Sequence, residues 1–150
     1  MRIDFYHLQN QNLEDVLPKL LSKAYGTGQK IVVKIGTEER VEFINTHLWT
    51  FEEGSFLPHG SKKDGNADLQ PIWLTAGDEI PNQAGIMFWV DGAQSNIEEL
   101  SGVNRILNIF DGNSETAIQQ ARHLWKELKS AGHEVYYWQQ DTSNRWQQKA

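Results

Sequence analysis

Short hydrophobic runs recur along the chain at the spacing of buried strands. The clearest of them are nearly continuous in apolar residues, which is typical of strands covered on both faces of a parallel sheet. They predict strands at residues 3–8, 30–35, 71–75, 86–90, 103–110 and 133–139. A small hairpin at Arg145-Trp146 is expected to pair with the last of these strands.

Three stretches between the strands carry apolar residues at helical spacing. They predict helices over residues 13–24, 38–48 and 115–131, with Thr37 and Ser114 as N-caps of the second and third. Pro18 inside the first helix predicts a kink or a broken first turn. The alternation of strand and helix predicts an α/β fold. We expect a single three-layer domain spanning residues 1–150, with a mostly parallel central sheet and helices on both faces.

Length and composition narrow the class of protein further. A chain of 150 residues fits one domain, and the absence of cysteine excludes disulfides, thiolate metal sites and cysteine catalysis. No signal-peptide pattern and no membrane-spanning apolar run is present, so a cytoplasmic protein without a membrane partner is expected.

The net charge of −6 argues against a general nucleic-acid binder, which needs a cationic surface. The charge is unevenly distributed, however. Residues 114–150 hold five basic and four acidic side chains, a balance of +1, which leaves −7 on the first 113 residues. The basic residues near the end of the chain are therefore candidates for a specific role.

Few residues suggest catalysis. Gly26-Thr27-Gly28 follows a predicted helix and precedes a strand, the wrong order for a phosphate loop, so it indicates a helix end. The five histidines lack metal-ligand spacing, and His59 near Asp64 and Asp68 is more typical of a solvated loop. No nucleophile motif occurs. We expect no catalytic residues, no cofactor and no metal.

Two acidic residues keep one enzymatic alternative open. Asp91-Gly92 and Asp111-Gly112 each end a predicted buried strand, and carboxylates at such positions can converge on a cation or substrate. Asp-Gly is also ordinary turn chemistry, which is the favoured interpretation. The alternative function is a small α/β nucleotide-binding protein or hydrolase that uses Asp91 and Asp111.

The helix predicted over residues 115–131 carries a second, basic face. Ala117, Ala121, Leu124 and Leu128 form the stripe that must face the sheet. Turned about 90° from that stripe are the candidate site residues Ile118, Arg122, Trp125 and Lys129, with Lys126 alongside. A tryptophan between cations suits an acidic peptide with an apolar end. Equally, Trp125 can extend the core while the cations reach past it to solvent; both interpretations stay open.

Residues 48–60, here called the corner segment, combine three large aromatic residues with a Pro-His-Gly exit. Such a combination is typical of a tight connection between a helix and a strand. We expect Trp49, Phe51 and Phe56 to be mostly buried anchors of that connection.

Several motifs together make the chain resemble the chi subunit of bacterial DNA polymerase III over nearly all 150 residues. The resemblance is carried by Phe5-Tyr6-His7-Leu8, Leu48-Trp49-Thr50-Phe51, Ser55-Phe56-Leu57-Pro58-His59-Gly60, Gln70-Pro71-Ile72-Trp73-Leu74, Asp111-Gly112-Asn113, Ala121-Arg122-His123-Leu124-Trp125-Lys126, Ala131-Gly132-His133 and Tyr137-Trp138-Gln139-Gln140. The corner segment is the most specific of these motifs.

The resemblance implies a non-catalytic adaptor in DNA replication with a mononucleotide-binding-like fold. Such a subunit binds the acidic, phenylalanine-ended C-terminal tail of single-stranded DNA-binding protein and links it to the clamp loader, in many bacteria together with a psi subunit. By position, the family's tail-binding arginine and aromatic residue correspond to Arg122 and Trp125. Ile118 stands where some members have a lysine, so Lys126 or Lys129 is expected to compensate.

A third interpretation makes psi or a helicase the main partner and the tail site secondary. In none of these interpretations does the chain bind nucleic acid sequence-specifically.

Overall fold

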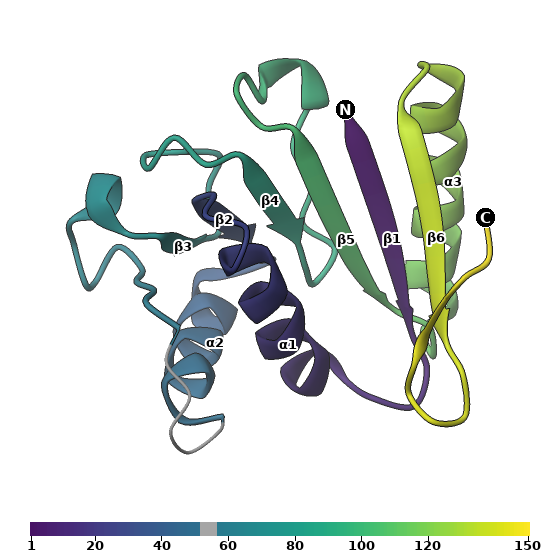
Figure 1. Cartoon of the computed structure of the whole chain (residues 1–150), viewed down its shortest axis with the longest axis horizontal. Helices are drawn as coiled ribbons and strands as arrows, with labels where there is room; N and C mark the ends of the chain where they lie inside the picture. The colour runs from purple at the N-terminus through teal and green to yellow at the C-terminus, as the bar shows by residue number, and fades with distance from the viewer. Residues whose placement is uncertain (52–56) are drawn as a thin grey trace.

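The computed structural model describes residues 1–51 and 57–150. Over these residues one sheet runs through the molecule in the strand order β3-β2-β4-β5-β1-β6-β7, and every pairing is parallel except that of β6 with β7 (Figure 1). The strands are β1 (Arg2–Leu8), β2 (Ile31–Lys34), β3 (Ile72–Thr75), β4 (Ile86–Trp89), β5 (Arg105–Asp111), β6 (Glu134–Gln140) and β7 (Trp146–Gln148).

Helices cover both faces of this sheet. Helices α1 (Leu13–Tyr25) and α2 (Glu38–Thr50) pack on one face, and α3 (Glu115–Ser130) packs on the other, together with two short 3₁₀ turns, Ala67–Leu69 and Ile97–Glu99. The predicted three-layer α/β fold is therefore confirmed. No helix in the described part of the chain has the length and hydropathy that a membrane crossing requires.

The alternation of side chains along each strand divides the core in two. On β1, Tyr6 and Leu8 face α1 and α2, whereas Ile3 and Phe5 face α3. Because both faces are covered, the strands read as nearly continuous apolar runs, which is why they could be recognised in the sequence.

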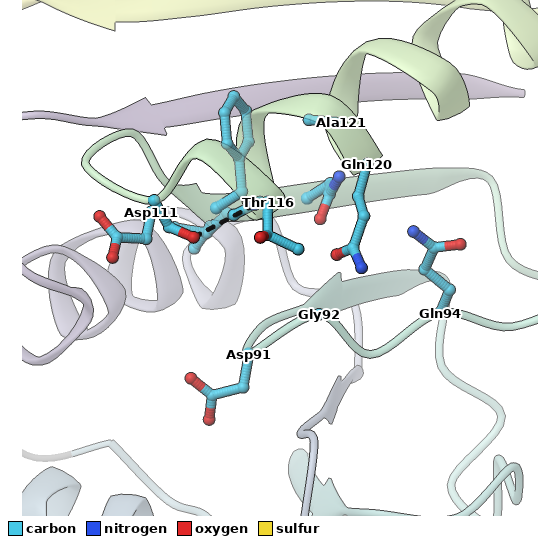
Figure 2. A pocket seen from close by; sticks show the side chains of 12 residues that line it. Asp91, Gly92, Gln94, Asp111, Thr116, Gln120 and Ala121 are labelled. Carbon is cyan, nitrogen blue, oxygen red and sulfur yellow. Dashed lines mark hydrogen bonds between the residues drawn. The ribbon is translucent and has the colours of Figure 1, made fainter.

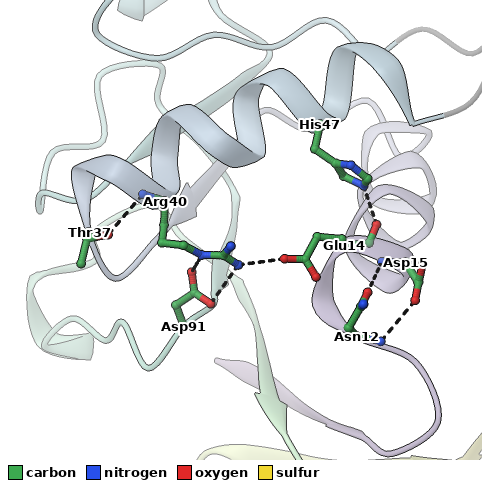
Figure 3. Close-up of polar contacts among 7 residues, drawn as sticks. All are labelled: Asn12, Glu14, Asp15, Thr37, Arg40, His47 and Asp91. Carbon is green, nitrogen blue, oxygen red and sulfur yellow. Dashed lines mark hydrogen bonds and ion pairs between the residues drawn. The ribbon is translucent and has the colours of Figure 1, made fainter.

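Helix α1 runs unbroken through Pro18. Its first turn, which the sequence predicted could be broken, is closed by a capping box between Asn12 and Asp15 (Figure 3). Proline has no N–H, so the carbonyl of Glu14 loses its partner within the helix. The Nε2 of His47 on α2 lies 2.7 Å from that oxygen and donates to it. A side chain from the neighbouring helix thus replaces the hydrogen bond that Pro18 removes.

The corner segment differs in part from expectation. Trp49 is 47% exposed, so its prediction as a buried anchor was wrong; its ring lies over that of buried His59, with 4.1 Å between centroids. Phe51 is partly buried against the core beside α1 and α2, while Phe56 lies outside the described residues. Both ring nitrogens of His59 face backbone carbonyls, those of Leu57 and Asn45. His59 is therefore a structural residue of this connection and does not point at Asp64 or Asp68.

The hairpin expected at Arg145-Trp146 is confirmed as the antiparallel pair of β6 and β7. Its turn is organised by Asp141, whose Oδ1 accepts the backbone N–H groups of Ser143 and Arg145 at 2.8 Å and 3.0 Å. These bonds lower the pKa of Asp141, the one from Arg145 most.

Candidate functional site

Helix α3 presents the basic face that the sequence singled out. Its first turn is capped by the Ser114 hydroxyl, which accepts the N–H of Ala117 at 3.2 Å, and Gly132 with φ near 90° follows its end. Ala121, Leu124 and Leu128 are buried against the sheet, as predicted, whereas Ala117, the fourth residue of the predicted stripe, is only partly buried. This packing fixes the rotation of the helix and thereby the direction of its other residues.

Trp125 lies at the boundary between the core and the surface. Its ring makes edge-to-face contacts with Phe5 on β1 and Tyr137 on β6, at centroid distances of 5.6 Å and 5.9 Å. Its other neighbour is Lys129, whose Nζ lies 5.5 Å from the ring centroid in a cation–π contact. Trp125 and Ile118 are both partly buried against the α3 side of the core. Trp125 therefore extends the core and still keeps part of its surface beside a cation.

The cations of this face lack acidic partners within residues 1–51 and 57–150. Among the described residues, no carboxylate forms an ion pair with Arg122, Lys126 or Lys129, and all three side chains are exposed. The carboxylate of Glu127 pairs instead with His123, at 2.9 Å along the helix. Three unpaired cations around a tryptophan form a surface that attracts anions. We call Ile118, Arg122, Trp125, Lys126 and Lys129 the α3 face.

Two residues that sequence reasoning missed, His7 and Tyr137, adjoin the α3 face. Tyr137 packs against Trp125, and its hydroxyl forms a 2.5 Å hydrogen bond with Nδ1 of His7. Both belong to motifs that carry the chi resemblance, but they lie 130 positions apart in the chain. Only the pairing of β1 with β6 brings them together, and no local sequence pattern reveals that pairing.

Arg122 acts electrostatically on both residues. Burial lowers the pKa of His7, and the charge of Arg122 lowers it further, while Asp111 raises it. Burial raises the pKa of Tyr137, and Arg122 opposes that shift. The positive charge of Arg122 therefore acts on His7 and Tyr137, which adjoin the α3 face.

The acidic residues at the strand ends are arranged differently from a catalytic pair. A pocket of about 250 Å³ between β5, α3 and the segment after β4 includes Asp91 and Asp111 in its lining. In Figure 2 the carboxyl groups of Asp91 and Asp111 lie at one side of this pocket and the amide groups of Gln94 and Gln120 at the other. The acids thus do not converge on the pocket's interior.

Asp91 forms an ion pair with Arg40. The Arg40 Nε donates to Oδ2 of Asp91 at 3.0 Å, and Nη2 of the same guanidinium donates to Glu14 at 3.1 Å (Figure 3). Asp91 has φ near 55° and is followed by Gly92 with φ near 79°, the backbone of a turn. This carboxylate joins the turn after β4 to helices α1 and α2.

Asp111 also serves a turn, since its Oδ1 accepts the N–H of Asn113 at 2.8 Å. A Cβ on Gly112 would lie 2.1 Å from the His7 ring and 2.2 Å from the Leu8 carbonyl oxygen, so only glycine fits there. No group of three or more His, Cys, Asp or Glu side chains in the described parts of the chain could hold a metal ion. Both acids are thus accounted for by local structure.

Comparison with known proteins identifies relatives. Residues 1–136 match the family model described as DNA polymerase III chi subunit, HolC. The chain is also 28% identical over 109 residues to a protein of Rickettsia prowazekii (strain Madrid E) named "Probable DNA polymerase III subunit chi". That alignment covers 73% of this chain and 65% of the relative, so the chain spans just under two thirds of the relative's length.

Proposed function

Because the chain belongs to the DNA polymerase III chi subunit family, we propose that it is a non-catalytic replication adaptor whose α3 face binds the acidic C-terminal tail of single-stranded DNA-binding protein. The adaptor links that protein, and the DNA that it coats, to the clamp loader. Arg122 and the neighbouring lysines hold the carboxylates of the tail, while Trp125 and Ile118 receive its terminal aromatic ring.

The observation that supports this proposal most is the unpaired state of Arg122, Lys126 and Lys129 around a partly exposed tryptophan. In a chain of net charge −6, three cations without carboxylate partners within the described residues form a local site for an anion. Contacts on an exposed surface are individually weak and sensitive to salt, so we expect roughly micromolar affinity. Several tails on one oligomeric partner would raise the apparent affinity.

Membership of a replication family also supports the further partners. We propose that clamp-loader subunits, with psi where a psi subunit exists, anchor the adaptor, and that a helicase is an additional partner. The site of action of such a subunit is the cytoplasm, where the bacterial chromosome is replicated. A nucleotide-binding or hydrolytic function has less support, because Asp91 is paired with Arg40 and Asp111 with the Asn113 backbone.

Isothermal titration calorimetry with a synthetic acidic peptide ending in phenylalanine tests the proposal. We expect Arg122→Ala to weaken binding at least tenfold, because the lost contact is a charge-assisted hydrogen bond worth roughly 1.5–3 kcal/mol. Lys62→Ala is a matched control, since Lys62 is also an exposed cation but pairs with Glu38 on α2 at 3.4 Å. Unchanged affinity in Arg122→Ala would remove the α3 face from the proposal.

A further inference from the structure

A second basic and aromatic surface lies on the other face of the sheet, between α1 and the hairpin of β6 and β7. Figure 1 shows the course of the backbone through these elements. Here a groove of about 660 Å³ is lined by the cations Lys19, Lys23 and Arg145 and by the rings of Trp138 and Trp146. No acidic side chain lines this groove within the described residues. None of the three cations has an ion-pair partner in that part of the chain.

The rings of Trp138 and Trp146 in the groove are fixed by contacts with buried residues of β1. The ring of buried Tyr6 stacks parallel to Trp138, at 6.2 Å and 10°, and meets Trp146 edge to face at 5.0 Å. The indole N–H of Trp138 donates to Oδ1 of Asp4 at 3.0 Å. Trp138 and Trp146 are only partly buried, so each keeps surface for a ligand while its orientation is fixed. A fixed ring loses little entropy when a planar group stacks on it.

The cationic character continues beyond Trp138 along the same face of β6. Asp4 is fully buried and accepts hydrogen bonds from Arg2, at 3.1 Å, and Arg105, at 3.0 Å. Arg2, Arg105 and Asp4 together carry a formal charge of +1. The Arg2 guanidinium also lies over the Tyr136 ring, 4.5 Å from its centroid. Glu134, on the same face by strand alternation, is the acidic exception.

Cations therefore lie at both ends of a row of aromatic side chains. We call the lining cations and rings of the groove, together with Arg2, Arg105 and Tyr136, the Trp138 strip. We propose that the Trp138 strip binds single-stranded nucleic acid without sequence preference, with bases on the rings and phosphates beside the cations. Such a combination is how proteins follow a single strand, because every base has a flat face and every linkage a charge.

The form of the surface favours a nucleic acid over an acidic peptide. A peptide with one aromatic end needs one pocket beside a cation cluster, as on the α3 face. The Trp138 strip instead offers successive rings, with cations on either side of them. The net charge of −6 opposes approach at long range, so binding is confined to this local surface and is weak.

The salt dependence of binding follows from the number of cations. Three phosphate contacts in the groove give a slope of log K against log salt of about −2 for a single strand. Affinity should therefore fall roughly 15- to 20-fold between about 50 mM and about 200 mM salt. This inference stands independently of the proposed tail site, which lies on the opposite face of the sheet.

Fluorescence anisotropy with a labelled oligothymidine of about 15 nucleotides tests the proposal at low salt. The triple variant Lys19→Gln, Lys23→Gln, Arg145→Gln removes only exposed charges, so the fold is kept. We expect it to lose at least tenfold in affinity and most of the salt slope. The matched control Arg122→Gln, Lys126→Gln, Lys129→Gln removes equal charge from the α3 face and should bind the oligothymidine as wild type does.

Each remaining outcome counts against a stated part of the proposal. Equal losses in the two triple variants, or no binding by wild type, would overturn it. If the acidic peptide displaces the oligothymidine from the wild type but not from the Lys19→Gln, Lys23→Gln, Arg145→Gln variant, the groove would be assigned to a peptide instead. An abasic oligodeoxynucleotide should bind at least tenfold more weakly, and equal binding would exclude base stacking. Peptide binding that survives the α3 control variant would refute the tail site alone.

Discussion

The hydrogen bond from His47 to the Glu14 carbonyl gives a quantitative test of how α1 accommodates Pro18. His47→Ala removes the donor that lies 2.7 Å from this oxygen and that replaces the N–H missing at Pro18. Residue Glu14 is only partly buried, so water can replace part of the lost interaction. We therefore expect His47→Ala to lower the free energy of unfolding by about 1 kcal/mol, near the lower end of the range for an unsatisfied carbonyl. For a chain of this size the melting temperature should fall by about 2–4 °C.

Pro18→Ala isolates that interaction. An alanine at position 18 has an N–H that can reach the Glu14 carbonyl, so the part of the His47→Ala cost that comes from this carbonyl, about 1 kcal/mol, should be absent in that background. The other contacts of His47, such as its ring contact with Phe51 at 6.4 Å, cancel in the double-mutant cycle. Urea unfolding followed by circular dichroism measures all four proteins. Equal costs of His47→Ala in both backgrounds, within about 0.3 kcal/mol, would refute the replacement of the missing bond.

Three further predictions concern the surroundings of β1. Gly112→Ala should destabilise the fold by at least about 2 kcal/mol in urea unfolding, because its Cβ would overlap His7 and the Leu8 carbonyl; a near-neutral variant would contradict this packing. His7 has a lowered pKa, so its contribution to stability is complete above about pH 6.5 and is lost as the pH falls. Arg122→Gln should raise that pKa in an NMR titration, and a fall would contradict the placement of Arg122. Burial is the main cause that raises the pKa of Tyr6 to about 12, so its contribution to stability is lost as the pH rises above 10. In an absorbance titration Tyr6 should ionise at a higher pH than an ordinary tyrosine, and Tyr6→Phe should remove that step. Ionisation of Tyr6 near pH 10 would contradict its burial.

The strands and helices could be predicted from the sequence because burial on both faces imposes its own pattern. Local sequence patterns predicted the buried strands β2 and β4, and the structure contains both. They also predicted the N-caps Thr37 and Ser114, and both residues cap their helices. Pairing between distant strands leaves no such signal. The sequence therefore predicted the α3 face but not the contact of His7 with Tyr137 beside it.

Other features were hidden because they depend on one side chain reaching a distant group. Pro18 suggested a disturbed helix, and only the packing of α2 against α1 shows that His47 supplies the missing donor. Trp49 was predicted to be a buried anchor because the corner segment combines aromatic and turn residues, but in the structure it is half-exposed at the end of α2, over the ring of His59. The Trp138 strip is assembled from α1, four strands and the turn before β7, so its charges are scattered along the chain and are outweighed in the acidic total.

The central proposal, that the α3 face binds the acidic tail, is tested most directly by amide NMR spectra recorded during a titration with the tail peptide. We expect the largest shifts on the backbone around Arg122, on the indole N–H of Trp125 and on Tyr137. Largest shifts at the indole groups of Trp138 and Trp146, with the α3 signals unmoved, would contradict that proposal.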